Sequence, residues 1–187
     1  MIKDSERTKA RLLEAATAEF AEYGIAGARI DRIAKVAETN KAMIYAYFGS
    51  KDELFDTAFS AHVGAWLEEV DFDVTDLPGY AGRLFDRSED DPAALRLSTW
   101  YRLERPGGVG LQAVIAINQL RLQRLEQAQR DGMLPTHFAP IQLLALIQAI
   151  ATAWATTNPE LGVLATTDRD DRRRAVVDAV VRLLADA

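Results

Sequence analysis

The stretch that decides the fold runs from Arg29 to Leu54 and reads RIDRIAKVAETNKAMIYAYFGSKDEL. A first short helix is indicated by apolar residues with the i, i+3, i+4, i+7 spacing of one helical face, namely Ile30, Ile33, Ala34 and Ala37. Asn40 is a good N-cap for a second short helix over residues 41–48.

This second helix has two faces with different expected roles. Ile44 and Phe48 are four residues apart and can point inward. They are expected to form the core of the small module together with Leu13, Phe20, Ile30, Ile33, Leu54 and Phe55. The other side chains are left for a second surface, in particular Lys41, Ala42, Tyr45 and Tyr47. Two short helices joined by a tight turn are typical of a helix-turn-helix, whose second helix enters the major groove of DNA. The stretch therefore predicts DNA binding.

Composition excludes several other classes of protein. The chain of 187 residues is long enough for one or two domains with a real core. It has no cysteine, so disulfides and cysteine metal sites are excluded, and its two histidines lie far apart at positions 62 and 137. We expect no metal and no cofactor. The polar first ten residues argue against a signal peptide, and the longest apolar run, 143–155, is too short to span a bilayer. We therefore expect a cytoplasmic protein without a membrane partner.

The net charge of −6 is unusual for a protein that binds phosphate. Residues 1–60 hold 9 Lys+Arg against 10 Asp+Glu, whereas residues 61–187 hold 13 against 18. All five lysines fall within the first 51 residues. The first part can present its positive groups on one face, although a mixed solvated surface is the alternative.

The rest of the chain also predicts helices, about nine in total, and an all-α fold. A helix over 7–23 ends at Gly24, and Ser50 with Glu53 forms a capping box for a long helix. Pro78, Gly79 and Gly82 predict a break over 74–82. Thr167 with Asp170 resembles a capping box for the last helix. Further helices are expected over residues 93–105, 111–130 and 141–156.

The N-terminal part resembles the TetR family of bacterial transcriptional regulators. The resemblance covers about residues 7–60, and its most specific segment is Tyr45-Ala-Tyr47-Phe48-Gly-Ser50-Lys51. It implies a three-helix DNA-binding domain at 1–50 and a helical domain for ligand binding and dimerisation at 51–187. It also implies a homodimer that binds a palindromic operator, usually as a repressor, and is released by a small-molecule effector.

Two positions depart from the family pattern. The turn before the recognition helix usually has Gly followed by an apolar residue, but this chain has Glu38-Thr39. Glu fits there only if the backbone avoids positive φ or tolerates it at a cost. The second helix usually begins with a hydroxyl residue, where this chain has Ala28-Arg29. We infer that Arg29 takes over the phosphate contact and that the cap is weakened.

The predicted DNA contacts divide into base-reading and phosphate-binding residues. Lys41 can pair with guanine and Ala42 can touch a thymine methyl, while Tyr45 and Tyr47 can donate to phosphate oxygens. Lys51 lies at a helix N-terminus that favours an anion. The full predicted set is Arg29, Asn40, Lys41, Ala42, Met43, Tyr45, Tyr47 and Lys51. The alternatives are an exposed helix without a partner and, for Tyr47, packing on the first helix.

The second part predicts an effector site and a dimer interface. Aromatic side chains with a few polar groups indicate a ligand site, and the candidates are Trp66, Trp100, Tyr101, Asn118, Gln119, Phe138 and Trp154. Each aromatic side chain alone is more often ordinary core. Arg121, Arg124, Glu126 and Arg130 are expected to be solvated or ion-paired. The last two long helices are expected to pair across a two-fold axis through Ala145, Ala149, Ala151, Ala153, Ala155 and the Val/Leu stripe at 176–184; intrachain core is the alternative.

Two other functions compete with a ligand-responsive repressor. One is an all-α ligand-binding or interaction protein that has lost or altered operator binding, which Glu38 beside the recognition helix favours. The other is a helical enzyme, which we do not expect because the chain has no G-x-S-x-G, P-loop or G-x-G-x-x-G motif. An activator in place of a repressor also fits the sequence.

Overall fold

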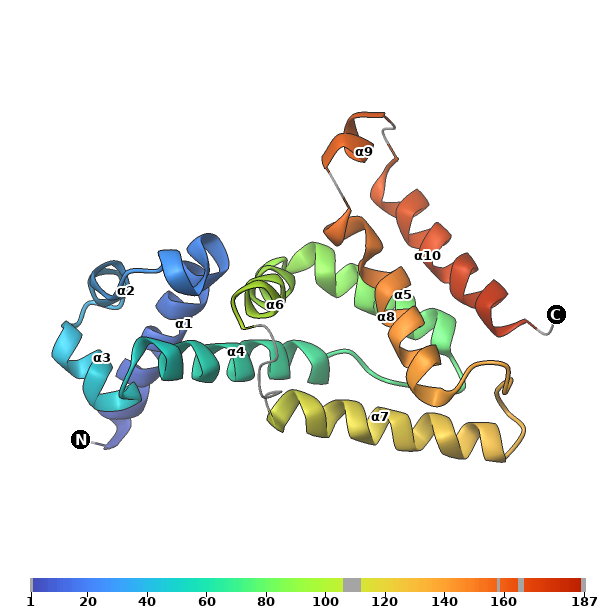
Figure 1. The fold of residues 1–187 in the computed structure, drawn as a ribbon, viewed down its shortest axis with the longest axis horizontal. Helices are drawn as coiled ribbons and strands as arrows, with labels where there is room; N and C mark the ends of the chain where they lie inside the picture. The colour runs from blue at the N-terminus through green and yellow to red at the C-terminus, as the bar shows by residue number, and fades with distance from the viewer. Residues whose placement is uncertain (1, 106–111, 158, 165–166, 186–187) are drawn as a thin grey trace. The chain divides into compact units, whose positions relative to one another are not determined.

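A computed structural model describes residues 2–105, 112–157, 159–164 and 167–185. Across these residues the chain forms ten helices and no strand, which confirms the all-α prediction (Figure 1). The helices are α1 (Ile2–Gly27), α2 (Ile30–Val36), α3 (Lys41–Phe48), α4 (Lys51–Glu68), α5 (Leu77–Asp90), α6 (Ala93–Glu104), α7 (Gln112–Arg130), α8 (Pro140–Thr156), α9 (Pro159–Leu164) and α10 (Arg169–Leu184). The six-residue α9 was not expected, and Leu111, the predicted start of α7, lies outside the described residues.

The helices form two compact units. The first unit contains residues 1–66 and 93–114, and the second contains residues 67–92 and 115–187. Helix α6 thus joins the helix-turn-helix region in the first unit, although it is distant in sequence. The predicted functional division at residue 50 concerns which residues bind DNA and which bind ligand, and it stays a prediction.

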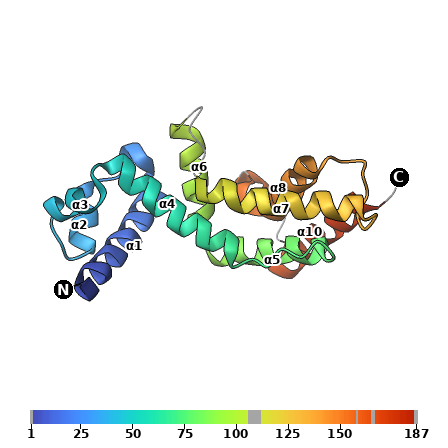
Figure 2. The same ribbon diagram turned by 90° about the horizontal axis from the view of Figure 1, so that it is seen from below.

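The first unit is built around α1, which packs on α6 and on α2. Helix α2 lies beside α1 in Figure 2. Phe20 of α1 is fully buried and meets Phe55 of α4 edge-on, with ring centroids 5.2 Å apart. The predicted core of the module is confirmed for Ile30, Ile33, Ile44, Phe48, Phe20, Leu54 and Phe55. Leu13 differs, because it is only half-buried and lines a surface groove between α1 and α4.

Gly24 ends the regular part of α1, as the sequence predicts. Its backbone has φ 70° and ψ −177°, so the helical path breaks before it resumes for a short turn to Gly27. A Cβ at this position would lie 2.7 Å from the Trp100 ring of α6. Glycine is therefore required here both by the positive φ and by the close approach of α6.

Both predicted caps around α3 and α4 are present. The Asn40 side chain accepts a hydrogen bond from the Met43 backbone N–H at 3.0 Å. The Ser50 hydroxyl accepts from the Glu53 N–H at 3.1 Å and donates to the Glu53 carboxylate at 2.9 Å. The second contact differs from a full capping box, in which the carboxylate accepts from the backbone of the cap residue.

In the second unit, the predicted break over 74–82 was wrong in part, because helix α5 already begins at Leu77. Asp76 caps the helix by accepting from the Gly79 N–H at 2.9 Å, and Pro78 lies in the first turn, where its missing N–H costs nothing. Gly82 is buried within the helix, close to Arg173 of α10. Pro78 and Gly79 thus lie in the first turn of α5, and Gly82 lets α10 approach it closely.

Helix α10 starts one residue later than expected and packs against α5 and α8. Its N-cap is Asp168, which accepts from the Asp171 N–H at 2.7 Å, so the predicted pair of Thr167 with Asp170 was wrong. Ion pairs join α10 to α5, among them Arg172 with Glu89 and Arg173 with Asp86, each at 2.7 Å. Over the described chain, none of the helices combines the length and apolar character needed to cross a bilayer.

Candidate DNA-binding surface

Helix α3 has the two faces that its sequence predicts. Ile44 and Phe48 are buried in the module, whereas Lys41, Ala42, Met43 and Tyr45 are exposed. These four exposed residues are among the first five of the helix, and the N-terminal part of the second helix is the part that reaches base edges in a helix-turn-helix. This surface therefore presents one cation, one methyl group, a thioether and a phenol side by side.

The turn before α3 is strained at Glu38. Glu38 has φ 51°, the one positive φ of a non-glycine residue in the described chain. Its carboxylate lies 3.2 Å from Nη1 of Arg11 on α1. The chain thus tolerates the left-handed backbone that glycine would adopt freely, and it neutralises the extra carboxylate with a local cation.

Glu38→Gly is expected to raise the free energy of unfolding by about 0.5–1 kcal/mol, because relief of the left-handed backbone outweighs the loss of an exposed ion pair. Glu38→Ala is the matched control, since it loses the same ion pair and keeps the strain. Chemical denaturation of both variants measures the difference. Equal stability of the Gly and Ala variants would show that the turn is not strained.

The start of α2 is capped by a residue that the sequence did not indicate. Arg29 occupies the N-cap position and its side chain makes no cap hydrogen bond. Glu19 of α1, which is 8% exposed, accepts from the Arg29 N–H at 2.7 Å and from Nε of Arg32 at 2.8 Å. Arg29 does not cap α2 with its own side chain, as expected, and the Glu19 carboxylate of α1 supplies an acceptor at this end of the helix instead.

Two of the predicted DNA-contacting cations share one carboxylate. Nζ of Lys41 lies 2.5 Å from Asp31, and Nη2 of Arg29 lies 4.0 Å from it. The hydrogen bond from Lys41 lowers the pKa of Asp31, and the charges of Lys41 and Arg29 act in the same direction. Asp31 thus stays ionised and holds both cations at the surface, where they are more than half exposed.

Tyr47 and Lys51 contact the protein itself. The Tyr47 hydroxyl lies 3.0 Å from Oγ of Ser5 on α1, and its ring is half-buried. Nζ of Lys51 donates to the carbonyls of Ala26 and Ala28 at 3.4 and 3.3 Å. The alternative expected for Tyr47, packing on the first helix, describes its position, while any DNA contact of either side chain stays a prediction.

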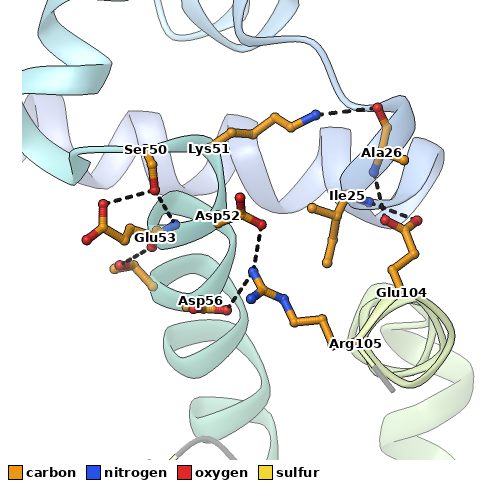
Figure 3. Close-up of polar contacts among 10 residues, drawn as sticks. Ile25, Ala26, Ser50, Lys51, Asp52, Glu53, Asp56, Glu104 and Arg105 are labelled. Atoms are coloured by element: carbon orange, nitrogen blue, oxygen red, sulfur yellow. Dashed lines mark hydrogen bonds and ion pairs between the residues drawn. The ribbon is translucent and has the colours of Figure 1, made fainter. Parts of the chain in front are cut away.

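Charged side chains at the C-terminal end of α6 contact helices α1 and α4 (Figure 3). After the break at Gly24, the N–H groups of Ile25 and Ala26 donate to the Glu104 carboxylate at 3.2 and 2.7 Å. Arg105 pairs with Asp52 at 2.9 Å and with Asp56 at 3.3 Å on α4. The last residue of α6 therefore accepts from the N–H groups freed by the break in α1, and the next residue pairs with the first two turns of α4.

Several predicted effector residues have structural contacts in the first unit. Nε1 of Trp100 donates to the Ala21 carbonyl at 3.2 Å, and Tyr101 packs on Phe59 with centroids 5.0 Å apart. Trp66 is 4% exposed, and its indole nitrogen has no hydrogen-bond partner among the described residues. Trp100 and Tyr101 thus hold α6 in place, and ligand contact by any of the three stays a prediction.

The other predicted effector residues lie in the second unit. Asn118 accepts from the Gln148 amide at 3.4 Å, and the rings of Phe138 and His137 are 4.7 Å apart. Gln119 and Trp154 are exposed. Arg121 was expected to be solvated or ion-paired, and this was wrong. Its side chain is 5% exposed and makes no ion pair within the described part of the chain. Arg130 does pair with Glu126, as expected.

The predicted dimer stripe is only partly available. Val176, Val180 and Ala151 are buried within their own unit, so the intrachain alternative holds for these three. A row on α8 remains exposed at four-residue spacing, namely Ile141, Ala145, Ala149 and Ala153.

Comparison with known proteins identifies this architecture. Residues 12–58 match "Bacterial regulatory proteins, tetR family", and residues 76–182 match "Tetracyclin repressor-like, C-terminal domain". The chain belongs to the TetR family. The HTH-type transcriptional repressor SCO4008 of Streptomyces coelicolor is 41% identical over 163 residues, covering 85% of this chain and 83% of that protein.

Solved structures agree with this assignment. SCO4942, a proposed transcriptional regulator from Streptomyces coelicolor, is 43% identical with a TM-score of 0.83, covering 94% of this chain and 97% of its own. The fatty acid degradation regulator FadR from Bacillus halodurans is 21% identical with a TM-score of 0.65, covering 94% and 97%, and that likeness concerns the fold alone. The chain is thus a TetR-family transcriptional regulator. The role of α3 as its recognition helix stays a prediction.

Proposed function

We propose that this protein is a ligand-responsive repressor that binds a palindromic operator as a homodimer and is released by a small-molecule effector. The main support is the division of α3, in which Ile44 and Phe48 anchor the helix while Lys41, Ala42 and Tyr45 stay exposed. Its action on bacterial DNA would place it in the cytoplasm.

The proposed contacts assign separate roles to the basic residues. Lys41 reads a guanine in the major groove, and Arg29 and Lys51 bind phosphates on either side. To bind DNA, Lys41 and Arg29 must break their ion pairs with Asp31. This costs little free energy because both ion pairs are exposed to solvent. Asn40 contributes by fixing the first turn of α3, while Met43, Tyr45 and Tyr47 line the proposed surface.

The proposed dimer uses the exposed row on α8. Ile141 is 58% exposed, and the three alanines at 145, 149 and 153 leave room for close approach of a second helix. Val181 on α10 is 50% exposed and can add apolar area. A two-fold interface of this kind presents two recognition helices to two half-sites of a palindrome.

Selection of bound duplexes from a random library tests the proposal on the full-length protein. We expect an enriched palindrome, and sedimentation should show two protomers for each duplex. If no sequence is enriched even at low salt, the repressor assignment is wrong. The protein would then be an all-α ligand-binding or interaction protein, in which Glu38 and Asp31 oppose phosphate.

A further inference from the structure

The interior of the second unit holds a cation with no counter-ion among the residues that the structure describes. The Arg121 side chain, on α7, is 5% exposed, and its Nη2 donates to the Leu67 carbonyl at 2.6 Å. Its Nη1 is buried and has no hydrogen-bond partner among the described residues. A buried charge without a partner is unfavourable, so this arrangement is unlike the surface ion pairs elsewhere in the protein.

Aromatic rings and a second unpaired donor surround this guanidinium. Its Cζ lies 5.5 Å from the ring centroids of both Phe72 and Tyr80, which meet edge-on at 4.9 Å. Tyr80 is fully buried, and its hydroxyl makes no hydrogen bond with the described residues. Burial raises the pKa of Tyr80, so the phenol stays neutral and keeps its proton to donate.

The charge of Arg121 also persists at neutral pH. Burial lowers its pKa, but from a starting value so far above neutrality that the guanidinium stays protonated. Arg124, one turn further along α7, adds a second positive charge and donates to the Phe72 carbonyl at 3.2 Å. The local field is therefore positive.

Neutral amides extend this polar cluster across three helices. Asn118 lies three residues before Arg121 on α7, and its side chain accepts from Gln148 of α8. The Gln148 amide also approaches the Tyr80 hydroxyl of α5 and acts to lower its pKa, less strongly than burial raises it, but the two groups do not reach hydrogen-bond geometry. The two atoms without partners, Nη1 of Arg121 and the Tyr80 hydroxyl, can both donate, and they lie among apolar rings.

We propose that these two donors bind the carboxylate of the effector, which is a small carboxylic acid with an apolar body. A planar guanidinium and a phenol match a carboxylate, because both lone-pair edges of the anion can be satisfied. The aromatic rings of Phe72 and Tyr80 contact the apolar part. This inference rests on the proposed ligand-responsive function and gives its effector a chemical class.

The same site is linked to the helix that leads to the DNA-binding module. Leu67 lies in the last turn of α4, where helix carbonyls lack intrahelical partners and a cation is favourable. A carboxylate at Nη1 neutralises the guanidinium that caps this turn. Ligand binding thus weakens a contact at the end of α4.

The test uses full-length protein with benzoate, phenylacetate and hexanoate as probes and their neutral amides as matched compounds. Isothermal titration and thermal shift follow binding to the wild type, Tyr80→Phe, Arg121→Gln and the control Arg124→Gln. We expect the acids alone to bind. Tyr80→Phe should weaken them about tenfold, corresponding to about 1.4 kcal/mol, and Arg121→Gln should abolish binding, while Arg124→Gln changes it little.

Tyr80→Phe keeps the test decisive even where Arg121→Gln fails to fold, because phenylalanine retains the buried ring and removes only a hydroxyl that makes no hydrogen bond with the described residues. The proposal is overturned if the acids do not bind, if the amides bind equally, or if Tyr80→Phe binds the acids as the wild type does. Affinity for the selected duplex without probe is measured in parallel. Loss of DNA binding with intact acid binding would refute the repressor function and leave the anion site standing.

Discussion

Arg29→Ala combined with Lys51→Ala should lower operator affinity on the order of a hundredfold and reduce the slope of log K against log salt by about 4. Each residue is proposed to neutralise one phosphate, and a dimer presents each of them twice. The loss should be similar for every duplex sequence, because phosphate contacts carry no base information. Fluorescence anisotropy with the selected duplex between low and physiological salt measures both quantities.

The control removes equal charge elsewhere, with Arg130→Ala and Arg182→Ala, two exposed residues of the second unit. This variant should keep nearly the full salt slope. Because Lys51 also donates to the carbonyls of Ala26 and Ala28, unfolding of both double variants is measured as well. An unchanged salt slope in a folded Arg29/Lys51 variant would contradict the phosphate assignment.

Glu19→Ala should lower the free energy of unfolding by about 2–3 kcal/mol, because it leaves the Arg29 N–H and the Arg32 guanidinium without their shared acceptor. Arg32, which pairs with Glu19, also packs over the Tyr23 ring, with its Cζ 4.1 Å from the ring centroid. Chemical denaturation provides the measurement. Operator affinity should fall too, since α2 supports α3.

Glu19→Gln separates the cap from the charge. The amide oxygen can still accept from the Arg29 N–H, so we expect a loss of about 1 kcal/mol. Equal losses for the Ala and Gln variants would assign the whole effect to the ion pair with Arg32. A change in Glu19→Ala within the range of ordinary surface substitutions, about 0.5 kcal/mol, would contradict the capping role.

The helix-turn-helix could be predicted from the sequence because its determinants are local. The apolar spacing at 30–37, the Asn40 cap and the glycine at position 24 each act within a few residues, and all three hold in the structure. The same local logic failed at Pro78 and Gly79, which begin α5 because Asp76 stands in the position to cap it. Turn residues indicate a boundary but do not say on which side the helix lies.

Features that depend on packing could not be predicted in this way. Glu19 lies ten residues before the N–H that it caps, and no local pattern pairs them. Arg121 lies among other charged and polar residues of α7, and only its contacts with Leu67, Phe72 and Tyr80 in the folded chain make it a buried cation. Val176 and Val180 have the apolar character of an interface but are used inside their own unit.

The base preference of Lys41→Ala tests most directly whether α3 reads the operator. Selection from random duplexes with the wild type and this variant gives the preference at each position of the half-site. We predict that one position in each half-site, a guanine in the wild-type selection, loses its preference while the rest of the palindrome is retained. An identical set of preferences in both proteins would contradict the assignment of α3 as the reading helix.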